Sequence, residues 1–358
     1  MKDRIPIIIP AYEPDDRLLV LLRSFKKEDC LVVLVDDGSG EQYKAIFQQA
    51  KDILQEKVIL LTHEVNRGKG RALKTAFSYV LEHFKDAIGV VTADSDGQHN
   101  LSSIKKVAEA IEKDPKALVL GVRCFDQEGI PWKSVFGNKL TAKVLTYISG
   151  IKISDTQTGL RGIPRDFMEK LLTVPGERFE FETEMLVESA GVCKICEVPI
   201  ETIYDSVDNH QTHFNPIADS IKIYRVLGKR FLKYVFSSLS ASLLDLLAFF
   251  VICSLISTES GVLYVSIATI LARIISATYN YIFNYRIVFR SNASVTESSV
   301  KYAALAIIQM ALSALLVTIG VTIFRGFPEI VIKAVVDTVL FFISYKIQQT
   351  LVFKKKMN

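Results

Sequence analysis

Four long apolar stretches in the last third of the chain constrain its fold more than any other feature. Each is about 22–26 residues long, and a helix needs about 20 apolar residues to cross roughly 30 Å of hydrocarbon. They run approximately over Phe231–Ile256, Val262–Tyr285, Ala303–Phe324 and Ile330–Phe353. We therefore predict an all-α membrane domain of four transmembrane helices at residues 227–358. Residues 1–226 mix charged and apolar side chains and form a separate domain in this prediction.

Positive charge is distributed unevenly among the segments that flank these stretches. The connectors at residues 257–261 and 325–329 carry one positive charge between them. Basic side chains instead precede the first stretch, lie between the second and third, and follow the fourth: Lys229, Arg230, Lys233, Arg286, Arg290, Lys301, Lys354, Lys355 and Lys356. Basic loops stay on the cytoplasmic side of a membrane. We therefore expect a multi-pass protein of the cell membrane, with the first domain and both termini in the cytosol.

Two charges lie deep within the first two stretches. Asp245 is eleven positions before the outer end of its stretch, and Arg273 is eleven positions after the outer start of the next. At 1.5 Å per residue, both lie about 16 Å below the membrane surface. An unpaired charge there costs about 2.5–3.5 kcal/mol, and helices joined by a short connector are antiparallel neighbours. We predict an Asp245–Arg273 ion pair, with Asp337 as the alternative partner for Arg273.

The composition excludes two classes of partner or scaffold. The net charge is only +4, and basic residues alternate with acidic ones in the first half, which argues against a nucleic-acid partner. The five cysteines are scattered and odd in number, so they do not indicate a disulfide framework. Cys193 and Cys196 form a C-x-x-C without a second pair or a nearby histidine. Because Val192, Ile195 and Val198 predict a strand there, we interpret both as core thiols.

Short apolar runs alternate with amphipathic stretches through the first domain. This alternation predicts an α/β domain with a Rossmann-like, mostly parallel sheet. In such sheets ligands bind outside the carboxyl ends of the strands. The expected strands are Ile5–Ile9, Leu31–Val35, Val58–Leu61, Ile88–Thr92 and Leu118–Val122.

Acidic or glycine-rich segments follow the first four expected strands. Each segment alone is typical of a turn or helix cap, and none has the spacing of a dinucleotide, P-loop or calcium motif. Together they place Asp94, Asp96 and Gln98 at one sheet edge, and these oxygen ligands suit Mg²⁺ or Mn²⁺. The segments are Pro10-Ala11-Tyr12-Glu13, Asp36-Asp37-Gly38-Ser39, Asn66-Arg67-Gly68-Lys69-Gly70 and Asp94-Ser95-Asp96-Gly97-Gln98-His99.

In this order the four segments resemble family 2 glycosyltransferases with the GT-A fold, over residues 5 to about 225. They are most similar to polyprenyl-phosphate sugar synthases of the dolichol-phosphate mannose synthase type. The four apolar stretches and the Val352-Phe353-Lys354 ending resemble the GtrA-like membrane domain. The resemblance implies metal-dependent, inverting transfer of a hexosyl group from a UDP- or GDP-sugar to polyprenyl phosphate at the cytosolic membrane face. The acceptor would be of the undecaprenyl or dolichyl type, and the product would serve cell-envelope glycosylation.

The resemblance also implies roles for the residues of the donor site. Asp94, Asp96 and Gln98 would bind the metal that bridges the diphosphate, with Asp96 in the catalytic set. His213 and Arg225 belong to the juxtamembrane segment that closes over the donor phosphates in relatives. The nucleotide-sugar would be held by Pro10, Tyr12, Glu13, Asp37, Lys69, Asp94 and Ser95, together with His213 and Arg225.

A later segment, Asp155–Gly162, resembles the part of the family that lines the acceptor side. Arg123 and Arg161 are expected to grip the acceptor phosphate through their planar guanidinium groups. Arg165 is a further candidate, with an exposed helix start as the alternative. Asp155 would orient the nucleophile or act as a base, with a cap as the alternative. One carboxylate of the next acidic run would face the sugar, and the candidates are Glu180, Glu182 and Glu184.

The sequence leaves several functions of the chain open. A processive polysaccharide synthase is the alternative enzyme, but the Gln-x-x-Arg-Trp motif of those enzymes is missing, since the single tryptophan is Trp132. The membrane domain could act as a flippase for the glycosylated lipid, as an anchor, or as a scaffold for a partner, and its helices could form a homo-oligomer. The sugar, the nucleotide and the lipid length are not determined.

Overall fold

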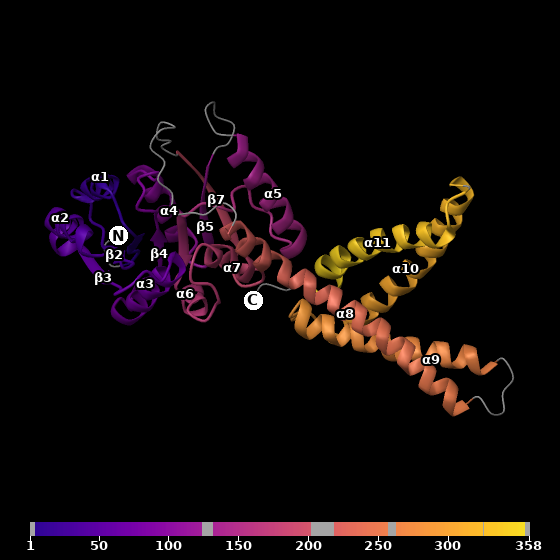
Figure 1. Ribbon diagram of the computed structural model, residues 1–358. Helices are drawn as coiled ribbons and strands as arrows, with labels where there is room; N and C mark the ends of the chain where they lie inside the picture. The colour runs from indigo at the N-terminus through magenta and orange to yellow at the C-terminus, as the bar shows by residue number, and fades with distance from the viewer. Residues whose placement is uncertain (1–3, 124–131, 202–217, 257–262, 325, 355–358) are drawn as a thin grey trace. The chain divides into compact units, whose positions relative to one another are not determined.

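The computed structural model describes residues 4–123, 132–201, 218–256, 263–324 and 326–354 (Figure 1). The chain divides into two compact units, Met1–Leu227 and Gly228–Lys356. Among the described residues, every strand lies in the first unit, and the second unit is helical.

A seven-stranded mixed sheet forms the first unit, with strand order β3-β2-β1-β4-β6-β5-β7. The five expected strands are present within two residues of their expected bounds. One antiparallel strand, β6, was not predicted; it lies between β4 and β5, and the other pairs are parallel. The strands are β1 (Ile7–Ala11), β2 (Val32–Asp36), β3 (Val58–Thr62), β4 (Gly89–Thr92), β5 (Leu118–Arg123), β6 (Arg161–Pro164) and β7 (Ile195–Ile200).

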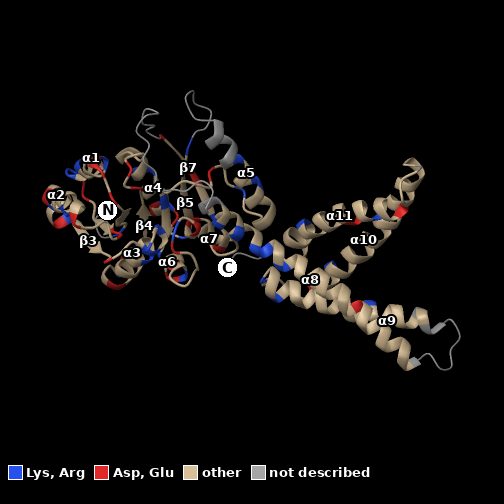
Figure 2. Cartoon of the chain, in the orientation of Figure 1, with Lys and Arg blue, Asp and Glu red and all other residues tan. Residues whose placement is uncertain are grey.

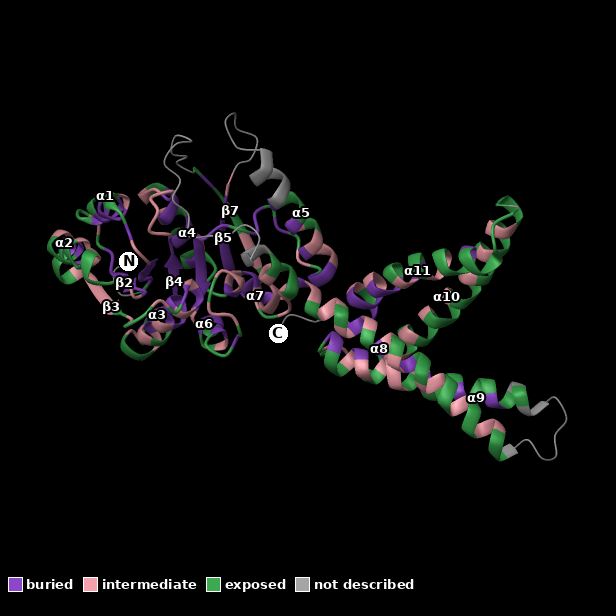
Figure 3. Cartoon of the chain, viewed as in Figure 1, coloured by how far each residue is buried: buried purple, intermediate pink, exposed green. Residues whose placement is uncertain are grey.

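Helices cover both faces of this sheet and produce two hydrophobic clusters. Helices α1 (Asp16–Phe25), α2 (Lys44–Leu54) and α4 (Leu101–Lys113) pack on one face. The opposite face carries α3 (Lys69–His83), α5 (Trp132–Ser149), α6 (Arg165–Leu171) and α7 (Glu180–Ser189). Strands buried on both faces require apolar residues at successive positions, which explains runs such as Ile7–Ile9. Figure 3 shows the central strands as the most buried part of this unit. Short 3₁₀ turns lie at Glu41–Tyr43 and Gln55–Lys57.

The strand order brings the sequence motifs to one edge of the sheet. Strand β1 pairs with β2 on one side and with β4 on the other. Their carboxyl ends are therefore adjacent, and the polar segments that follow them meet. The Asp37 amide donates to Ala11 O at 2.8 Å, and the Ala93 amide donates to Ile8 O at 2.9 Å. These bonds hold the acidic segments directly against the first strand.

The second unit consists of two helical hairpins, and its helices carry few charges (Figure 2). Two described segments are long and apolar enough to cross a membrane, Ile221–Leu255 and Val295–Ile323. The other two expected stretches are also helical. The helices are α8 (Ala218–Ile256), which begins in the first unit, α9 (Leu263–Phe283), α10 (Val295–Ile323) and α11 (Glu329–Ile347). π-Helical turns follow α9 at Asn284–Val288 and α11 at Gln348–Val352.

The two hairpins repeat one another in sequence and in contacts. Both π-helical turns end in valine, which is followed by phenylalanine and then a basic residue. Equivalent residues meet directly: Asn284 Nδ2 donates to Gln348 Oε1 at 3.0 Å, and the rings of Phe289 and Phe353 stack at 5.2 Å. Other ring contacts come in matching pairs, namely Tyr281–Phe353 with Tyr345–Phe289, and Tyr234–Phe289 with Tyr302–Phe353. This repeat was not predicted.

The expected membrane charges lie close together in the second unit. Arg273 Nη2 is 3.5 Å from Asp245 Oδ2, and Ser276 Oγ donates to Asp245 Oδ1 at 2.8 Å. The alternative partner, Asp337, instead binds Lys333 Nζ at 2.9 Å and accepts from Ser313 Oγ at 2.6 Å. The geometry therefore places Arg273 with Asp245 rather than with Asp337.

We expect Asp245 and Arg273 to be coupled in stability. Asp245→Ala leaves Arg273 without its anionic partner inside the membrane domain, and removing one member of such a pair costs more than removing both. Asp245→Ala with Arg273→Ala should therefore be less destabilising than the sum of the single changes. A double-mutant cycle on thermal unfolding in detergent measures this coupling, and strictly additive losses would show that the two residues are independent.

Candidate functional site

A cavity of about 470 Å³ opens at the carboxyl ends of β1, β2 and β4. Most of the residues expected to bind the donor or metal line it. Of the candidates in the four segments that follow β1 to β4, Glu13 does not line the cavity. Its amide donates to Ser39 Oγ at 2.9 Å. The lining consists of Pro10, Ala11, Tyr12, Arg17, Asp37, Asn66, Gly68, Lys69, Asp94, Ser95, Asp96, Gln98, Arg178 and Phe179. Arg17, Asn66, Arg178 and Phe179 were not predicted for this site.

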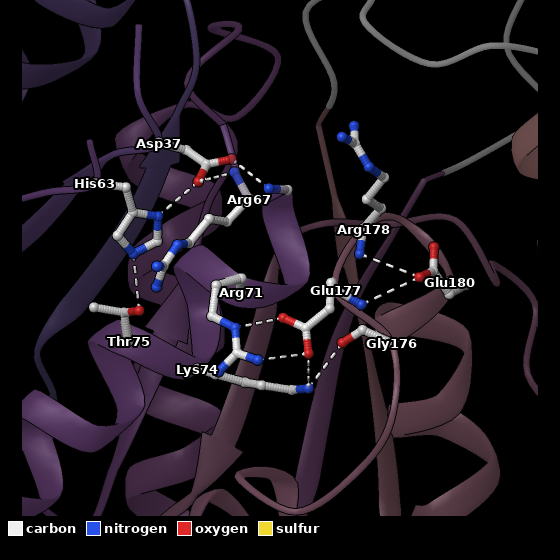
Figure 4. Close-up of polar contacts among 11 residues, drawn as sticks. Asp37, His63, Arg67, Arg71, Lys74, Thr75, Gly176, Glu177, Arg178 and Glu180 are labelled. Carbon is white, nitrogen blue, oxygen red and sulfur yellow. Dashed lines mark hydrogen bonds and ion pairs between the residues drawn. The ribbon is translucent and has the colours of Figure 1, made fainter. Parts of the chain in front are cut away.

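Asp37 joins the second polar segment to the third (Figure 4). Its Oδ1 accepts the Arg67 amide at 3.0 Å, and its Oδ2 accepts the Gly68 amide at 2.7 Å. His63 Nδ1 lies 2.7 Å from Asp37 Oδ1, and His63 Nε2 lies 2.9 Å from Thr75 Oγ1. Asp37 therefore shapes the loop that enters α3 as well as lining the cavity. His63 was not singled out from the sequence, although its place directly after β3 was a usable signal.

The N-terminus of α3 packs closely against the loop that precedes α7. A Cβ on Gly68 would lie 2.5 Å from Arg178 Cγ and from Glu177 O, so only glycine fits there. Arg71 and Lys74 on α3 both bind the Glu177 carboxylate, with Arg71 Nη2 at 2.8 Å and Lys74 Nζ at 3.2 Å from Oε1. These contacts fasten the residues 176–180 loop to α3, as Figure 4 shows.

Asp94 is held from two sides. Lys69 Nζ lies 2.6 Å from Asp94 Oδ1 and 3.0 Å from Glu182 Oε2, and His99 Nε2 is 3.6 Å from Asp94 Oδ2. Burial raises the pKa of Asp94, but Lys69 and His99 outweigh it and hold the pKa well below its ordinary value. Gly159 closes over this carboxylate, because a Cβ there would lie 2.1 Å from Asp94 Oδ2. Asp94 is therefore a fixed, ionised group.

Asp96 differs from Asp94 because no cation is paired with it. Burial, followed by the neighbouring Asp94 charge, raises the pKa of Asp96. The Gln98 amide donates to Asp96 Oδ1 at 3.1 Å. Within the described residues no group of three or more His, Cys, Asp or Glu side chains could hold a metal. Asp96, Asp94 and Gln98 still fit Mg²⁺ or Mn²⁺, since such ions bind one or two carboxylates and complete their coordination with substrate phosphates.

The predicted acceptor groups Arg123 and Asp155 bind each other. Arg123 Nε and Nη2 donate to the two oxygens of Asp155 at 2.7 and 3.0 Å. The Asp155 side chain is fully buried, and its Oδ1 also accepts the Gln157 amide at 3.0 Å. Neither residue lines the cavity. Asp155 is therefore buried and paired with Arg123, and its role toward the nucleophile stays a prediction.

Arg161 and Arg165 do not line this cavity either, and the prediction that they hold the acceptor phosphate stays a prediction. Arg161 is 1% exposed, and its guanidinium donates to Thr158 O at 2.9 Å and to Glu182 O at 2.7 Å. Arg165 starts α6 and donates to the carbonyls of Leu81, Phe84 and Ala87 near the end of α3. Both arginines satisfy backbone carbonyls inside the fold.

The remaining candidates lie elsewhere. Arg225 is an exposed residue of α8 outside the cavity lining. His213 lies outside the described residues. Glu182, one of the three carboxylates expected to face the sugar, contacts the cavity residue Lys69. Glu180 instead accepts the amides of Glu177 and Arg178 at 3.1 and 3.3 Å.

Comparison with known proteins agrees with this geometry. Residues 7–172 match the model of the family Glycosyl transferase family 2. An uncharacterised protein of Methanocaldococcus jannaschii is 31% identical over 211 residues, which cover 57% of this chain and 83% of the relative. The chain belongs to glycosyl transferase family 2. This family 2 glycosyltransferase also carries a second matched region, because residues 233–353 match the GtrA/DPMS transmembrane domain.

Characterised relatives of the glycosyltransferase act on lipid phosphates, according to their names. A UDP-N-acetylglucosamine–dolichyl-phosphate N-acetylglucosaminyltransferase of Methanococcus voltae is 28% identical over 56% of this chain and 86% of its own. A human dolichyl-phosphate beta-glucosyltransferase is 26% identical over 56% of this chain and 66% of its own. The transmembrane family and the two long apolar helices identify the glycosyltransferase as a membrane protein.

Proposed function

We propose that this glycosyltransferase moves a hexosyl group from a nucleotide-sugar to a polyprenyl phosphate at the cytosolic face of the membrane. The observation that carries the proposal is the cavity itself. Its wall combines Asp94, Asp96 and Gln98 with Pro10, Tyr12 and Asp37 from two neighbouring strands. The chain also carries a membrane domain, which supports a lipid-linked acceptor.

Two groups of cavity residues suit two parts of the donor, the nucleoside and the metal-bound diphosphate. Asp37 and Tyr12 supply hydrogen-bonding groups for the nucleoside, and the hydrogen bond with Glu13 raises the pKa of Tyr12 further above its ordinary value. Asp96, with Asp94 and Gln98, would hold the divalent metal. When bound, that ion stabilises the negative charge that develops on the nucleoside diphosphate as it leaves.

The proposed reaction does not require a strong general base. The acceptor phosphate is already anionic near neutral pH, so its oxygen can attack the anomeric carbon without losing a proton to the protein. Attack from the face opposite the leaving group inverts the anomeric centre. The buried Asp155 fits this scheme, because Arg123 already neutralises it. Lys69 keeps Asp94 and Glu182 fixed during the reaction.

The topology proposal rests on the basic residues that flank the helices. Four transmembrane helices with basic ends inside place the catalytic domain on the side where cells keep nucleotide-sugars. Helices α9 and α11 supply the second and fourth spans in this arrangement.

One assay tests both the reaction and its side of the membrane. Sealed inside-out and right-side-out vesicles containing the full chain and polyprenyl phosphate receive a panel of external UDP- and GDP-sugars, each with Mg²⁺ or Mn²⁺. We expect lipid-linked sugar to form in inside-out vesicles, and chelator to abolish it. Product in right-side-out vesicles alone would overturn the orientation, and full activity in chelator would overturn the metal role. Transfer to no polyprenyl phosphate would contradict the proposed acceptor.

A further inference from the structure

Nearly every charged side chain that lines the donor cavity is matched within the protein. Arg17 Nη2 lies 2.8 Å from Asp15 Oδ2. Asp37 accepts two backbone amides and contacts His63, as described above. Lys69 and Asp94 form an ion pair at 2.6 Å, and Lys69 also binds Glu182. These charges balance locally, so they leave little net attraction for a charged substrate group.

Two lining residues stand outside this balance. Asp96 has no cation paired with it and accepts only the Gln98 amide among the contacts described above. Arg178 is the other: within the described part of the chain, its guanidinium contacts no carboxylate or carbonyl. Counting partners from the described residues alone, the cavity thus presents one uncompensated anion and one uncompensated cation. Asp96 fits a metal ion, and Arg178 requires an anion.

The backbone and the aliphatic stem of Arg178 are held in place, although its guanidinium head has no partner in the described part of the chain. Its amide donates to Glu180 Oε1 at 3.3 Å, and its carbonyl accepts the Phe181 amide at 3.2 Å. The side-chain stem lies against Gly68, where a Cβ would approach Arg178 Cγ to 2.5 Å. Figure 4 shows the guanidinium pointing away from Glu177 and Glu180. Those two carboxylates are already engaged, Glu177 by Arg71 and Lys74 and Glu180 by backbone amides.

The contacts between the residues 176–180 loop and α3 have two effects on Arg178. Arg71 and Lys74 neutralise Glu177, so the acid next to Arg178 in sequence does not compete for its guanidinium. The same contacts hold the loop on α3, which keeps the Arg178 stem at the cavity wall. A held stem reduces the conformational entropy lost when the head binds a ligand.

We propose that Arg178 binds a substrate phosphate in the donor cavity. The inference rests on the proposed function, since both substrates of that reaction carry phosphate. A planar guanidinium binds phosphate oxygens through two parallel hydrogen bonds. The phosphate comes from the donor diphosphate or from the acceptor lipid. In either case Arg178 supplies positive charge that Arg161 and Arg165, which are engaged by backbone carbonyls, do not supply.

The test compares Arg178→Gln and Arg178→Lys with wild type in the full-length enzyme in lipid nanodiscs. Arg23→Gln is the matched control, because Arg23 is an exposed arginine of α1 outside the cavity lining. Initial rates are measured with nucleotide-sugar and polyprenyl phosphate varied separately, and binding of UDP and GDP with metal is measured by calorimetry. Thermal unfolding of each variant confirms that the fold is retained.

We expect Arg178→Gln to raise one KM by about 10- to 100-fold, as loss of a hydrogen bond to a charged group does. A higher KM for the nucleotide-sugar with weaker nucleotide binding identifies the donor diphosphate. A higher KM for the lipid alone identifies the acceptor phosphate. Arg178→Lys should recover part of the loss, since it keeps the charge but not the two parallel bonds.

The inference fails if Arg178→Gln matches Arg23→Gln in both KM values and in nucleotide binding. Failure of the proposed function looks different. In that case the wild-type enzyme transfers no sugar to polyprenyl phosphate, while calorimetry with UDP and GDP still reports on Arg178. Weaker nucleotide binding by Arg178→Gln then supports a phosphate contact, and unchanged binding of a nucleotide that wild type binds contradicts it.

Discussion

Asp96→Asn should lower kcat by at least about 100-fold, the usual effect of removing a main electrostatic stabiliser. Asp96 is the cavity carboxylate without a paired cation, so it is the ligand most available to the metal. The amide of asparagine keeps the size of the side chain but removes its charge. Initial rates at saturating substrate and metal measure the loss. Asp86→Asn, a change at an exposed acid outside the cavity, should leave the rate unchanged.

The same substitution should stabilise the metal-free protein. Burial and Asp94 raise the pKa of Asp96, so the folded state disfavours the ionised carboxylate. The stability linked to its neutral form is fully present below the ordinary carboxyl pKa and is lost as the pH rises through the raised value. Wild type in chelator should therefore lose more stability than Asp96→Asn as the pH rises from about 4 to neutrality.

Thermal unfolding of both proteins across this range, with and without metal, provides the measurement. Metal should raise the unfolding temperature of wild type more than that of Asp96→Asn, because the variant lacks the charged ligand. Equal metal stabilisation of the two proteins, combined with an unchanged kcat, would remove Asp96 from the metal site.

Arg161→Ala should lower the free energy of unfolding by roughly 3 kcal/mol, because it leaves buried carbonyls without a donor and opens a cavity. Arg161 is 1% exposed and bonds Thr158 O and Glu182 O, so it joins the loop before β6 to α7. Chemical denaturation of the variant measures this loss.

Kinetics then separate a structural role for Arg161 from contact with the acceptor. For the folded fraction of Arg161→Ala, the KM for polyprenyl phosphate should change no more than the KM for the nucleotide-sugar. A selective rise in the acceptor KM, with stability unchanged, would instead support the predicted contact of Arg161 with the acceptor phosphate. Arg23→Gln again serves as the exposed control.

Sequence patterns alone predicted five strands of the sheet and the shared site at their carboxyl ends. Continuous apolar runs predicted the five strands, since a strand covered on both faces needs apolar residues at every position. The motifs after those strands predicted one shared site, because parallel strands bring their carboxyl ends to one edge. Pro10, Tyr12, Asp37, Lys69, Asp94, Ser95, Asp96 and Gln98 indeed line one cavity, and their roles there stay predictions.

The tertiary structure alone decided the surroundings of the arginines. A motif shows that an arginine is present, but its availability depends on which carbonyls and carboxylates the fold brings within 3 Å. Those groups come from distant segments: Arg161 reaches Glu182 O, and Arg165 reaches the end of α3. Among the described residues the Arg178 guanidinium has no partner, because Arg71 and Lys74 bind the neighbouring Glu177.

Strand β6 and the hairpin repeat also needed the three-dimensional structure. β6 is only four residues long and overlaps the segment that was expected to line the acceptor side, so its antiparallel pairing with β4 and β5 left no periodic signal. The repeat is carried by a few residues around the π-helical turns, such as Asn284 and Gln348, which become recognisable once they touch. Local patterns determine which elements form, whereas long-range contacts determine which polar groups remain available for chemistry.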